Sequence, residues 1–181
     1  MDEGELIRRV LGGQQEQYAC LVERYQEPLI HYLRTILTDE DQVFDCAQEA
    51  FLAAYRNLGR YSEKYTFRAW LYAIARHKAI DHLRKQRREV TGAVKENLAD
   101  NLPGPEDLWL AKEESQGVAE ILQVLPEHYR QVLYLRYHQD LSYEEIASVL
   151  KITTSRVKTY LHRGKERLRQ ELARRGIHER N

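Results

Sequence analysis

The side chains with the clearest chemical use in this sequence are cations that gather near its end. Residues 151–175 contain nine lysines and arginines and only two acids, Glu166 and Glu171. Cations at this density can neutralise the phosphates of a nucleic acid. The chemistry that the sequence favours is therefore non-covalent binding of a phosphate backbone.

Residues for covalent catalysis or metal binding do not gather anywhere along the chain. No Ser/His/Asp set, no pair of acid and base carboxylates and no glycine-rich phosphate loop is evident. The two cysteines, Cys20 and Cys46, form neither a CxxC pair nor a Cys/His cluster. We expect both to be small buried side chains in a reducing compartment. An all-α enzyme would need a cluster of metal ligands, so we expect no enzyme, no metal and no cofactor.

The charge of the chain is divided unevenly, although 28 basic and 28 acidic residues cancel overall. Residues 1–88 carry 14 Lys/Arg and 13 Asp/Glu, residues 89–116 carry 2 and 7, and residues 117–181 carry 12 and 8. An acidic middle segment thus conceals two regions with basic faces. The local field, more than the total charge, decides which partners a protein attracts.

The elements that must position these cations are helices. Apolar residues recur at helical spacing in residues 18–37 and 43–58, and strand alternation is absent. Further helices are expected at 3–11, before Gly12 and Gly13, at 66–88 and at 127–137 after Pro126. The interval from about 90 to 106 lacks this period and contains Pro103-Gly104-Pro105.

This pattern predicts an all-α protein of two helical domains joined by an acidic flexible linker. The expected bounds are 1–89 for the first domain, 90–112 for the linker and 113–181 for the second domain. The second domain is expected to contain a helix-turn-helix.

The stretch 141–169 predicts two short helices with a tight turn between them. Ser142 and Glu145 have the spacing of a capping box, and Thr153 can cap the second helix. With Val157 and Leu161 inward, the outward residues are Arg156, Lys158, Thr159, His162, Arg163 and Lys165. The N-terminal residues of such a helix can reach base edges in the major groove. An ordinary helical hairpin with a solvated basic face is the alternative.

Two features of the first domain go beyond a simple DNA-reading module. With Val43, Ala47, Phe51 and Ala54 buried, residues 42–58 present an outward face of Asp45, Gln48, Glu49 and Leu52. An exposed leucine among acids and an amide suits a partner helix, although a plain solvated face would look similar.

The second feature is the aromatic-rich turn 61–67, which leads into a helix with basic residues near its end. Aromatic rings or a loop pocket can accept bases that have left the stack, each worth about 1–3 kcal/mol. Core packing is the preferred interpretation for Phe67 and Trp70, whereas both interpretations stay open for Tyr61 and Tyr65. His77 and His82 lie on the same basic helix and suit DNA contact or a surface position.

The sequence resembles the extracytoplasmic-function (ECF) sigma factors of bacterial RNA polymerase over nearly its whole length. The segment DCAQEAFLAAYRNLGRY resembles the part of that family that binds core polymerase. FRAWLYAIARHKAIDHLRKQRR resembles the part that melts and reads the promoter minus-ten element. LPEHYRQVLYLRYHQDLSYEEIASVLKITTSRVKTYLHRGKERLR resembles the domain that binds the minus-thirty-five element.

The resemblance implies roles for particular residues in three groups. Core polymerase would be bound by Asp45, Gln48, Glu49 and Leu52. The minus-ten DNA would be bound by Tyr61, Ser62, Glu63, Lys64, Tyr65, His77, Lys78, Asp81, Arg84, Lys85 and Arg88. The minus-thirty-five DNA would be bound by Thr154, Ser155, Arg156, Lys158, Thr159, His162, Arg163 and Lys165.

Several positions depart from the pattern of that family. His77 and Asp81 stand where the family commonly reads minus-ten bases with Asn. Lys151 replaces a usual turn glycine, Ser155-Arg156 replaces a usual Gly-Thr, and Tyr160 stands where a basic residue is common. These departures indicate a shifted promoter motif.

The resemblance therefore implies a transcription initiation factor that directs core RNA polymerase to specific promoters and opens them at the minus-ten element. Its expected partners are core polymerase and promoter DNA, and many relatives are held by a membrane-associated anti-sigma factor. The acidic linker would thread past the polymerase active centre. The start of the chain reads as no signal peptide, and no apolar run is long enough for a membrane span, so a cytoplasmic protein is expected. A stand-alone helix-turn-helix regulator is the alternative function.

Overall fold

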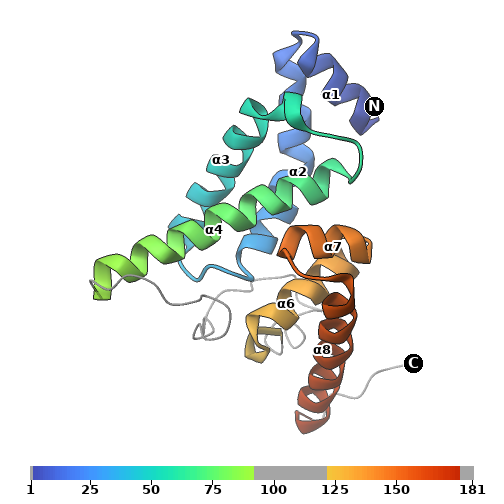
Figure 1. The fold of residues 1–181 in the computed structure, drawn as a ribbon. Coiled ribbons are helices and arrows are strands. Elements are labelled where there is room, and N and C mark those ends of the chain that lie inside the picture. Colours follow the sequence, from blue (N-terminus) through green and yellow to red (C-terminus); the bar gives the residue numbers. More distant parts are fainter. Residues whose placement is uncertain (1, 92–121, 176–181) are drawn as a thin grey trace. The chain divides into compact units, whose positions relative to one another are not determined.

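The computed structural model describes residues 2–91 and 122–175, and every regular element in these two ranges is helical (Figure 1). The chain divides into two compact units. The first contains α1 (Glu3–Leu11), η1 (Gln15–Gln17), α2 (Tyr18–Leu33), α3 (Glu40–Arg56), η2 (Leu58–Arg60) and α4 (Phe67–Thr91). The second contains α6 (Glu127–Leu133), η3 (Tyr134–His138), α7 (Tyr143–Leu150) and α8 (Thr154–Arg174).

The first unit is built around α2, α3 and α4, which all contact one another, and α1 packs against α2 (Figure 1). The predicted stripe on α3 is confirmed, because its apolar residues at three- and four-residue spacing are buried. On α2 the stripe is buried from Leu21 to Leu33, but the helix ends there. Leu37 is buried from the turn that follows, so the expected single helix over 18–37 is shorter than predicted.

Aromatic side chains join the helices of the first unit. Tyr32 of α2 stacks on Tyr72 of α4 with 5.0 Å between ring centroids, and both are fully buried. The hydroxyl of Tyr18 donates to the carbonyl of Phe51 at 2.7 Å. These contacts give α2 a fixed place against the two helices that carry the predicted binding residues.

The two cysteines lie in different environments, which corrects one prediction. Cys46 is buried as expected, but Cys20 is exposed near the start of α2. The helical period explains the difference, since Leu21 takes the inward position and turns its neighbour toward solvent. Both cysteines are free thiols.

In the second unit, the helix that follows Pro126 changes its hydrogen-bond pattern. The expected single helix over 127–137 is α-helical only to Leu133, and η3 continues it as a π-helix. The wider turn leaves Leu135 fully buried while Tyr137 is exposed. Arg136 then donates to the carbonyl of Leu141 at 2.9 Å, which ties the π-turn to the segment that leads into α7.

The predicted helix-turn-helix is formed by α7 and α8. Ser142 and Glu145 make the complete capping box, and the hydroxyl of Thr153 accepts from the backbone N–H of Arg156 at 3.2 Å. Lys151 ends α7 with a left-handed φ of 54°. The lysine thus adopts the conformation that a glycine would favour, at a steric cost of about 1–2 kcal/mol. Its presence changes the side chain at the turn and leaves the turn in place.

Gly164 allows α8 to approach α6 closely. A Cβ atom at this position would lie 3.3 Å from Leu133 Cδ1 and 3.4 Å from Tyr129 Cβ. We expect Gly164→Val to destabilise the second unit by about 1–3 kcal/mol, because the added methyl groups have no space. Denaturant unfolding of the full chain, with hydrogen exchange to assign the loss to α6 and α8, measures this.

Gly59 provides the control for that substitution. A Cβ atom at Gly59 would meet no atom within 4 Å, so Gly59→Val is expected to leave the stability nearly unchanged. Equal stability of the wild type and Gly164→Val would contradict the close approach of the two helices.

The first unit extends further than predicted toward the acidic segment. Helix α4 runs to Thr91, so the first two residues of the expected linker are helical. The rest of that linker, including Pro103-Gly104-Pro105, and the apolar Val118 and Ile121 lie outside the described residues. Within the part of the chain that is described, no helix is long and apolar enough to cross a membrane.

Candidate functional site

The predicted recognition helix presents its cations on one exposed side. Val157 and Leu161 are buried, as predicted. All eight residues expected to bind minus-thirty-five DNA are exposed, namely Thr154, Ser155, Arg156, Lys158, Thr159, His162, Arg163 and Lys165. The amphipathic period of α8 alone produces this separation. The helix therefore offers a continuous polar and basic face at its N-terminal half.

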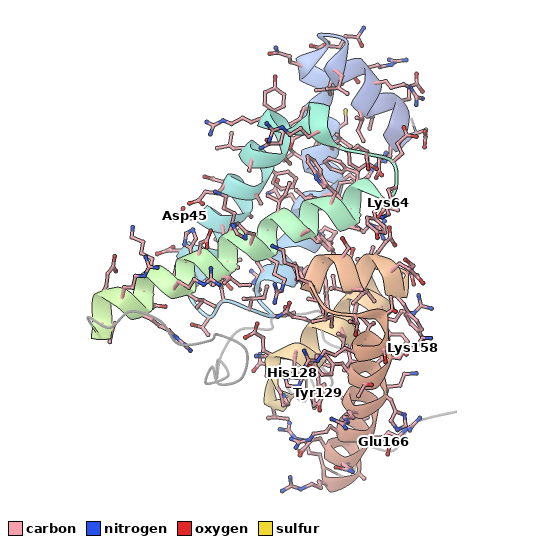
Figure 2. The ribbon with its side chains drawn as sticks, in the orientation of Figure 1. Asp45, Lys64, His128, Tyr129, Lys158 and Glu166 are labelled. Atoms are coloured by element: carbon pink, nitrogen blue, oxygen red, sulfur yellow. The ribbon has the colours of Figure 1, made fainter. Side chains whose placement is uncertain are left out.

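An open hollow of about 740 Å³ lies beside this face, and the sequence did not indicate it. His128, Tyr129, Arg156, Thr159, Tyr160 and Arg163 are among the residues that line it. His128 and Tyr129 lie side by side on α6 (Figure 2). Their ring centroids are 4.7 Å and 5.8 Å from that of Tyr160. Tyr160 departs from the family pattern, and the sequence offers no signal that pairs it with rings on α6.

Three cations of α8 lie over aromatic rings of the second unit. The Arg156 guanidinium carbon is 5.7 Å from the Tyr160 ring centroid. Lys158 Nζ is 5.9 Å from the ring of Tyr143, and Lys165 Nζ is 5.0 Å from that of Tyr137. A cation–π contact at an exposed site is worth about 0.5–1 kcal/mol. These rings restrict where the cations lie before any DNA is present.

The predicted polymerase-binding residues share one face of α3. All four are exposed, namely Asp45, Gln48, Glu49 and Leu52. The apolar Leu52 is 54% exposed. Asp45 is labelled on this helix in Figure 2. Phe44, beside Asp45, is also 46% exposed and was not predicted to be part of the face. The face is thus acidic around the exposed Leu52, a composition that suits a protein partner. Phe44 lies at the edge of this face, in a hollow that residues of α2 also line.

Glu49 joins that face to the basic side of α4. Its Oε1 lies 3.2 Å from His82 Nε2, and its Oε2 lies 3.8 Å from Lys78 Nζ. Lys78 was predicted to hold DNA phosphates and Glu49 to bind polymerase. The two predicted functions therefore meet at a single carboxylate.

On the exposed side of α4, Asp81 lies among basic residues. Asp81 Oδ2 lies 3.3 Å from His77 Nε2, and Asp81 Oδ1 lies 3.7 Å from Arg84 Nη1. Lys85 and Arg88 are exposed in the next turns. Asp81 therefore lies between His77 and Arg84 on the exposed side of α4. His77 and Asp81 are the two residues predicted to read minus-ten bases.

The aromatic turn before α4 is packed at its ends and exposed at its tip. Phe67 is fully buried and Trp70 half-buried, which agrees with core packing for these rings. The hydroxyl of Tyr61 donates to the carbonyl of Tyr65 at 2.8 Å, and its ring contacts that of Trp70. The three tip residues, Ser62, Glu63 and Lys64, are exposed (Lys64 is labelled in Figure 2).

The described residues of the two units do not bring nucleophiles or metal ligands together. Burial raises the pKa of the Cys46 thiol to about 12, with the Glu49 carboxylate acting in the same direction, so the thiol stays protonated. Among residues 2–91 and 122–175, no group of three His, Cys, Asp or Glu side chains could hold a metal ion. Exposed charge and aromatic rings are what these surfaces offer.

Comparisons with known proteins agree on one family. The family model described as Sigma-70 region 2 matches residues 21–89, and that described as Sigma-70, region 4 matches residues 115–168. The ECF RNA polymerase sigma factor SigW of Bacillus subtilis is 34% identical over 177 residues, which cover 92% of this chain and 94% of that protein. The chain belongs to the ECF sigma factors. The ECF RNA polymerase sigma-E factor of Escherichia coli K12 is likewise 34% identical over 176 residues, with 89% of each chain covered.

Solved structures agree with the fold of this sigma factor. CnrH, in complex with the cytosolic domain of CnrY, has a TM-score of 0.65 at 25% identity, covering 93% of this chain and 95% of that one. RpoE of Bartonella quintana, in complex with the anti-sigma factor NepR, has a TM-score of 0.69 at 19% identity, with 87% and 98% covered. At that identity the second likeness bears on the fold alone.

Membership of this family confirms the expected function class. The sigma factor is a transcription initiation factor that acts with core RNA polymerase and promoter DNA, and it is not an enzyme. A stand-alone helix-turn-helix regulator is excluded, because the match includes region 2 as well as the helix-turn-helix of region 4.

Proposed function

We propose that the sigma factor divides its work between three exposed surfaces. The face of α3 formed by Asp45, Gln48, Glu49 and Leu52 binds core polymerase. The loop 61–65 and the exposed side of α4 bind the opened minus-ten element. The N-terminal half of α8 docks in the major groove of the minus-thirty-five element.

The contacts of Glu49 support this proposal most strongly. The acidic face of α3 and the basic side of α4 share Glu49, through its contacts with His82 and Lys78. Polymerase and promoter DNA would therefore be bound side by side on one small unit. This arrangement would couple the arrival of polymerase to the placing of the DNA strand.

For the minus-ten element, the proposal assigns two kinds of contact. Lys78, Arg84, Lys85 and Arg88 hold phosphates, and each neutralised phosphate adds salt dependence to binding. His77 and Asp81 face the bases. The loop 61–65 holds a base that has left the stack, for which extrusion costs a few kcal/mol.

For the minus-thirty-five element, the N-terminal position of Arg156 on α8 supports direct base contact, with Thr154, Ser155, Lys158 and Thr159 around it. His162, Arg163 and Lys165 lie farther along the helix and are assigned to the phosphate backbone. Because Arg156 lies over Tyr160, its guanidinium enters the groove already restricted in direction.

The domain bounds belong to the same proposal. Residues 1–91 form the domain for polymerase and minus-ten DNA, since α4 ends at Thr91. The rest of the predicted linker, up to residue 112, is an acidic tether that threads past the polymerase active centre, and 113–181 form the minus-thirty-five domain. We place the protein in the cytoplasm, where polymerase acts. An anti-sigma factor is a further proposed partner, by analogy with the family.

Transcription in vitro tests the proposal, with purified core polymerase and a library of genomic fragments. Wild type is expected to yield transcripts whose start sites share two upstream elements. Arg156→Ala is expected to lower initiation about tenfold and to relax the preference at one or two upstream bases, because a lost bidentate base contact costs about 1–3 kcal/mol.

Lys165→Ala is the comparison variant on the same helix. It is expected to weaken all promoters alike and to reduce the salt dependence of binding by about one phosphate contact. A wild type that fails to direct core polymerase to any fragment would overturn the proposal. If both variants lower transcription equally at all promoters, Arg156 does not read a base.

A further inference from the structure

Helix α1 has no part in the three proposed surfaces, yet one of its side chains reaches two other helices. Glu3 Oε1 accepts a hydrogen bond from the backbone N–H of Phe67 at 3.2 Å. Its other oxygen accepts from the hydroxyl of Tyr25 on α2. A single carboxylate therefore connects α1, α2 and the first residue of α4.

The contact with Phe67 completes the N-terminus of α4. The first backbone N–H groups of a helix have no partner within the helix. The hydroxyl of Thr66 accepts from the N–H of Ala69 at 3.2 Å, and Glu3 accepts from that of Phe67. A carboxylate at this end of a helix is also favoured by the helix dipole. The end of α4 that adjoins the aromatic loop is thus held by a residue 64 positions away.

Phe67 transmits this placement to the loop. Its fully buried ring lies 5.7 Å from that of Tyr25 and 5.8 Å from those of Tyr61 and Trp70, measured between centroids. Tyr61 in turn donates to the carbonyl of Tyr65 and so closes the loop on itself. A shift of Phe67 would therefore move the base of the loop at both of its ends.

The Tyr25 hydroxyl that donates to Glu3 stays protonated. Burial, and after it the contact with Glu3, raises the pKa of Tyr25 to about 12, so the phenol keeps its proton at any physiological pH. By contrast, Arg8 of α1 lies 4.0 Å from Glu63 at the tip of the loop, with 68% and 79% of the two side chains exposed. Such an exposed pair contributes little. Glu3 is therefore the main link between α1 and the loop.

We propose that Glu3 is a positioning residue for promoter opening, which holds the loop 61–67 in the shape that receives the extruded minus-ten base. This inference rests on the proposed role of that loop. Glu3 touches no DNA itself and acts through Phe67 and Tyr25.

The test uses the full chain bound to core polymerase and a single-stranded oligonucleotide that carries the non-template minus-ten sequence found with the library. Glu3→Ala is expected to weaken oligonucleotide binding about tenfold, since loss of hydrogen bonds to a charged group is costly. Glu3→Gln keeps one acceptor oxygen and is expected to lose only about threefold. Affinity for core polymerase and for minus-thirty-five duplex is expected to stay within twofold of wild type for both.

Glu5→Ala is the matched control, because Glu5 lies one half-turn further on α1 and pairs with Arg9 of the same helix at 2.6 Å. It is expected to bind the oligonucleotide as wild type does. Hydrogen exchange is the second readout, with faster exchange expected in residues 61–70 of the Glu3 variants and unchanged exchange in α3.

Two results separate this inference from the proposed function. If alanines at Ser62, Glu63 and Lys64 leave oligonucleotide binding intact, the loop does not hold a base and both ideas fail. If those alanines weaken binding while Glu3→Ala and Glu3→Gln do not, only the role of Glu3 is wrong. If Glu3→Ala does not fold, the same measurements on Glu3→Gln test the role of Glu3. If Glu3→Gln loses as much affinity for core polymerase as for the oligonucleotide, Glu3 is only a structural residue.

Discussion

Replacing Asp45 with lysine is expected to reduce the affinity of the sigma factor for core RNA polymerase by about a hundredfold or more. Asp45 is exposed on α3 next to Phe44 and one turn from Glu49. Reversing a charge inside a protein interface places like charges together, at a cost of several kcal/mol. Because the side chain faces solvent in the free protein, its replacement is expected to cost the fold little. Binding to immobilised core polymerase measures the effect.

Glu49 would be a poorer choice for this experiment than Asp45. Its carboxylate also contacts His82 and Lys78 of α4. A lysine at position 49 would lose the contact with His82, repel Lys78 and so disturb the side of the unit that is proposed to bind DNA. Asp45 is not found in an ion pair within the described residues, so its reversal breaks no contact with α4, whereas reversal of Glu49 would break two.

Glu16→Lys provides the control for the Asp45 variant. Glu16 lies exposed in η1 of the same unit, and its substitution changes the net charge by the same amount. The control is expected to bind core polymerase as wild type does. Equal losses for both variants would attribute the effect to net charge, and no loss for Asp45→Lys would remove the α3 face from the polymerase interface.

Alanines at Ser62, Glu63 and Lys64 are expected to slow open-complex formation about ten- to a hundredfold while leaving binding of closed duplex promoter nearly unchanged. A base outside the stack has lost a few kcal/mol of stacking and pairing, and in the proposed function the loop that receives the base offsets that loss. In the proposed function, duplex binding depends instead on α8 and on the cations of α4, which these changes leave in place. Permanganate reactivity of unpaired thymines measures opening, and filter binding at low temperature measures the closed complex.

The tip of the loop is the appropriate place for that change, because its three residues are exposed. Tyr61 would be less informative, since its ring packs on Phe67 and Trp70 and its removal would disturb the core. Alanines at Gln14, Gln15 and Glu16, three exposed residues of another turn in the same unit, form the control. Equal loss of opening and of duplex binding would make the loop a structural element only.

Much of the fold was predictable because its determinants are local. The capping box of Ser142 and Glu145 and the cap at Thr153 act over three residues, so they can be recognised from spacing alone. The exposed sides of α3 and α8 follow from the 3.6-residue period. The prediction was wrong for Cys20, and it missed the change from α6 to the π-helix η3, which depends on packing.

The partners of the binding residues were not predictable in the same way. His82 meets Glu49 across 33 residues, and Phe67 meets Glu3 across 64. The hollow beside α8 likewise needs His128 and Tyr129 from another helix. No period or cap relates positions so far apart, because only the packing of helices brings them together.

The sequence by itself thus determined which helices form, which of their sides meet solvent, and that the chain resembles a sigma factor, since caps and helical period are short-range properties. Only the tertiary structure decided that one carboxylate, Glu49, serves both the acidic side of α3 and the basic side of α4. It also decided that Glu3 completes the N-terminus of the helix behind the aromatic loop. Both arrangements depend on how α1, α2, α3 and α4 pack, and side-chain contacts between helices exist only once that packing is formed.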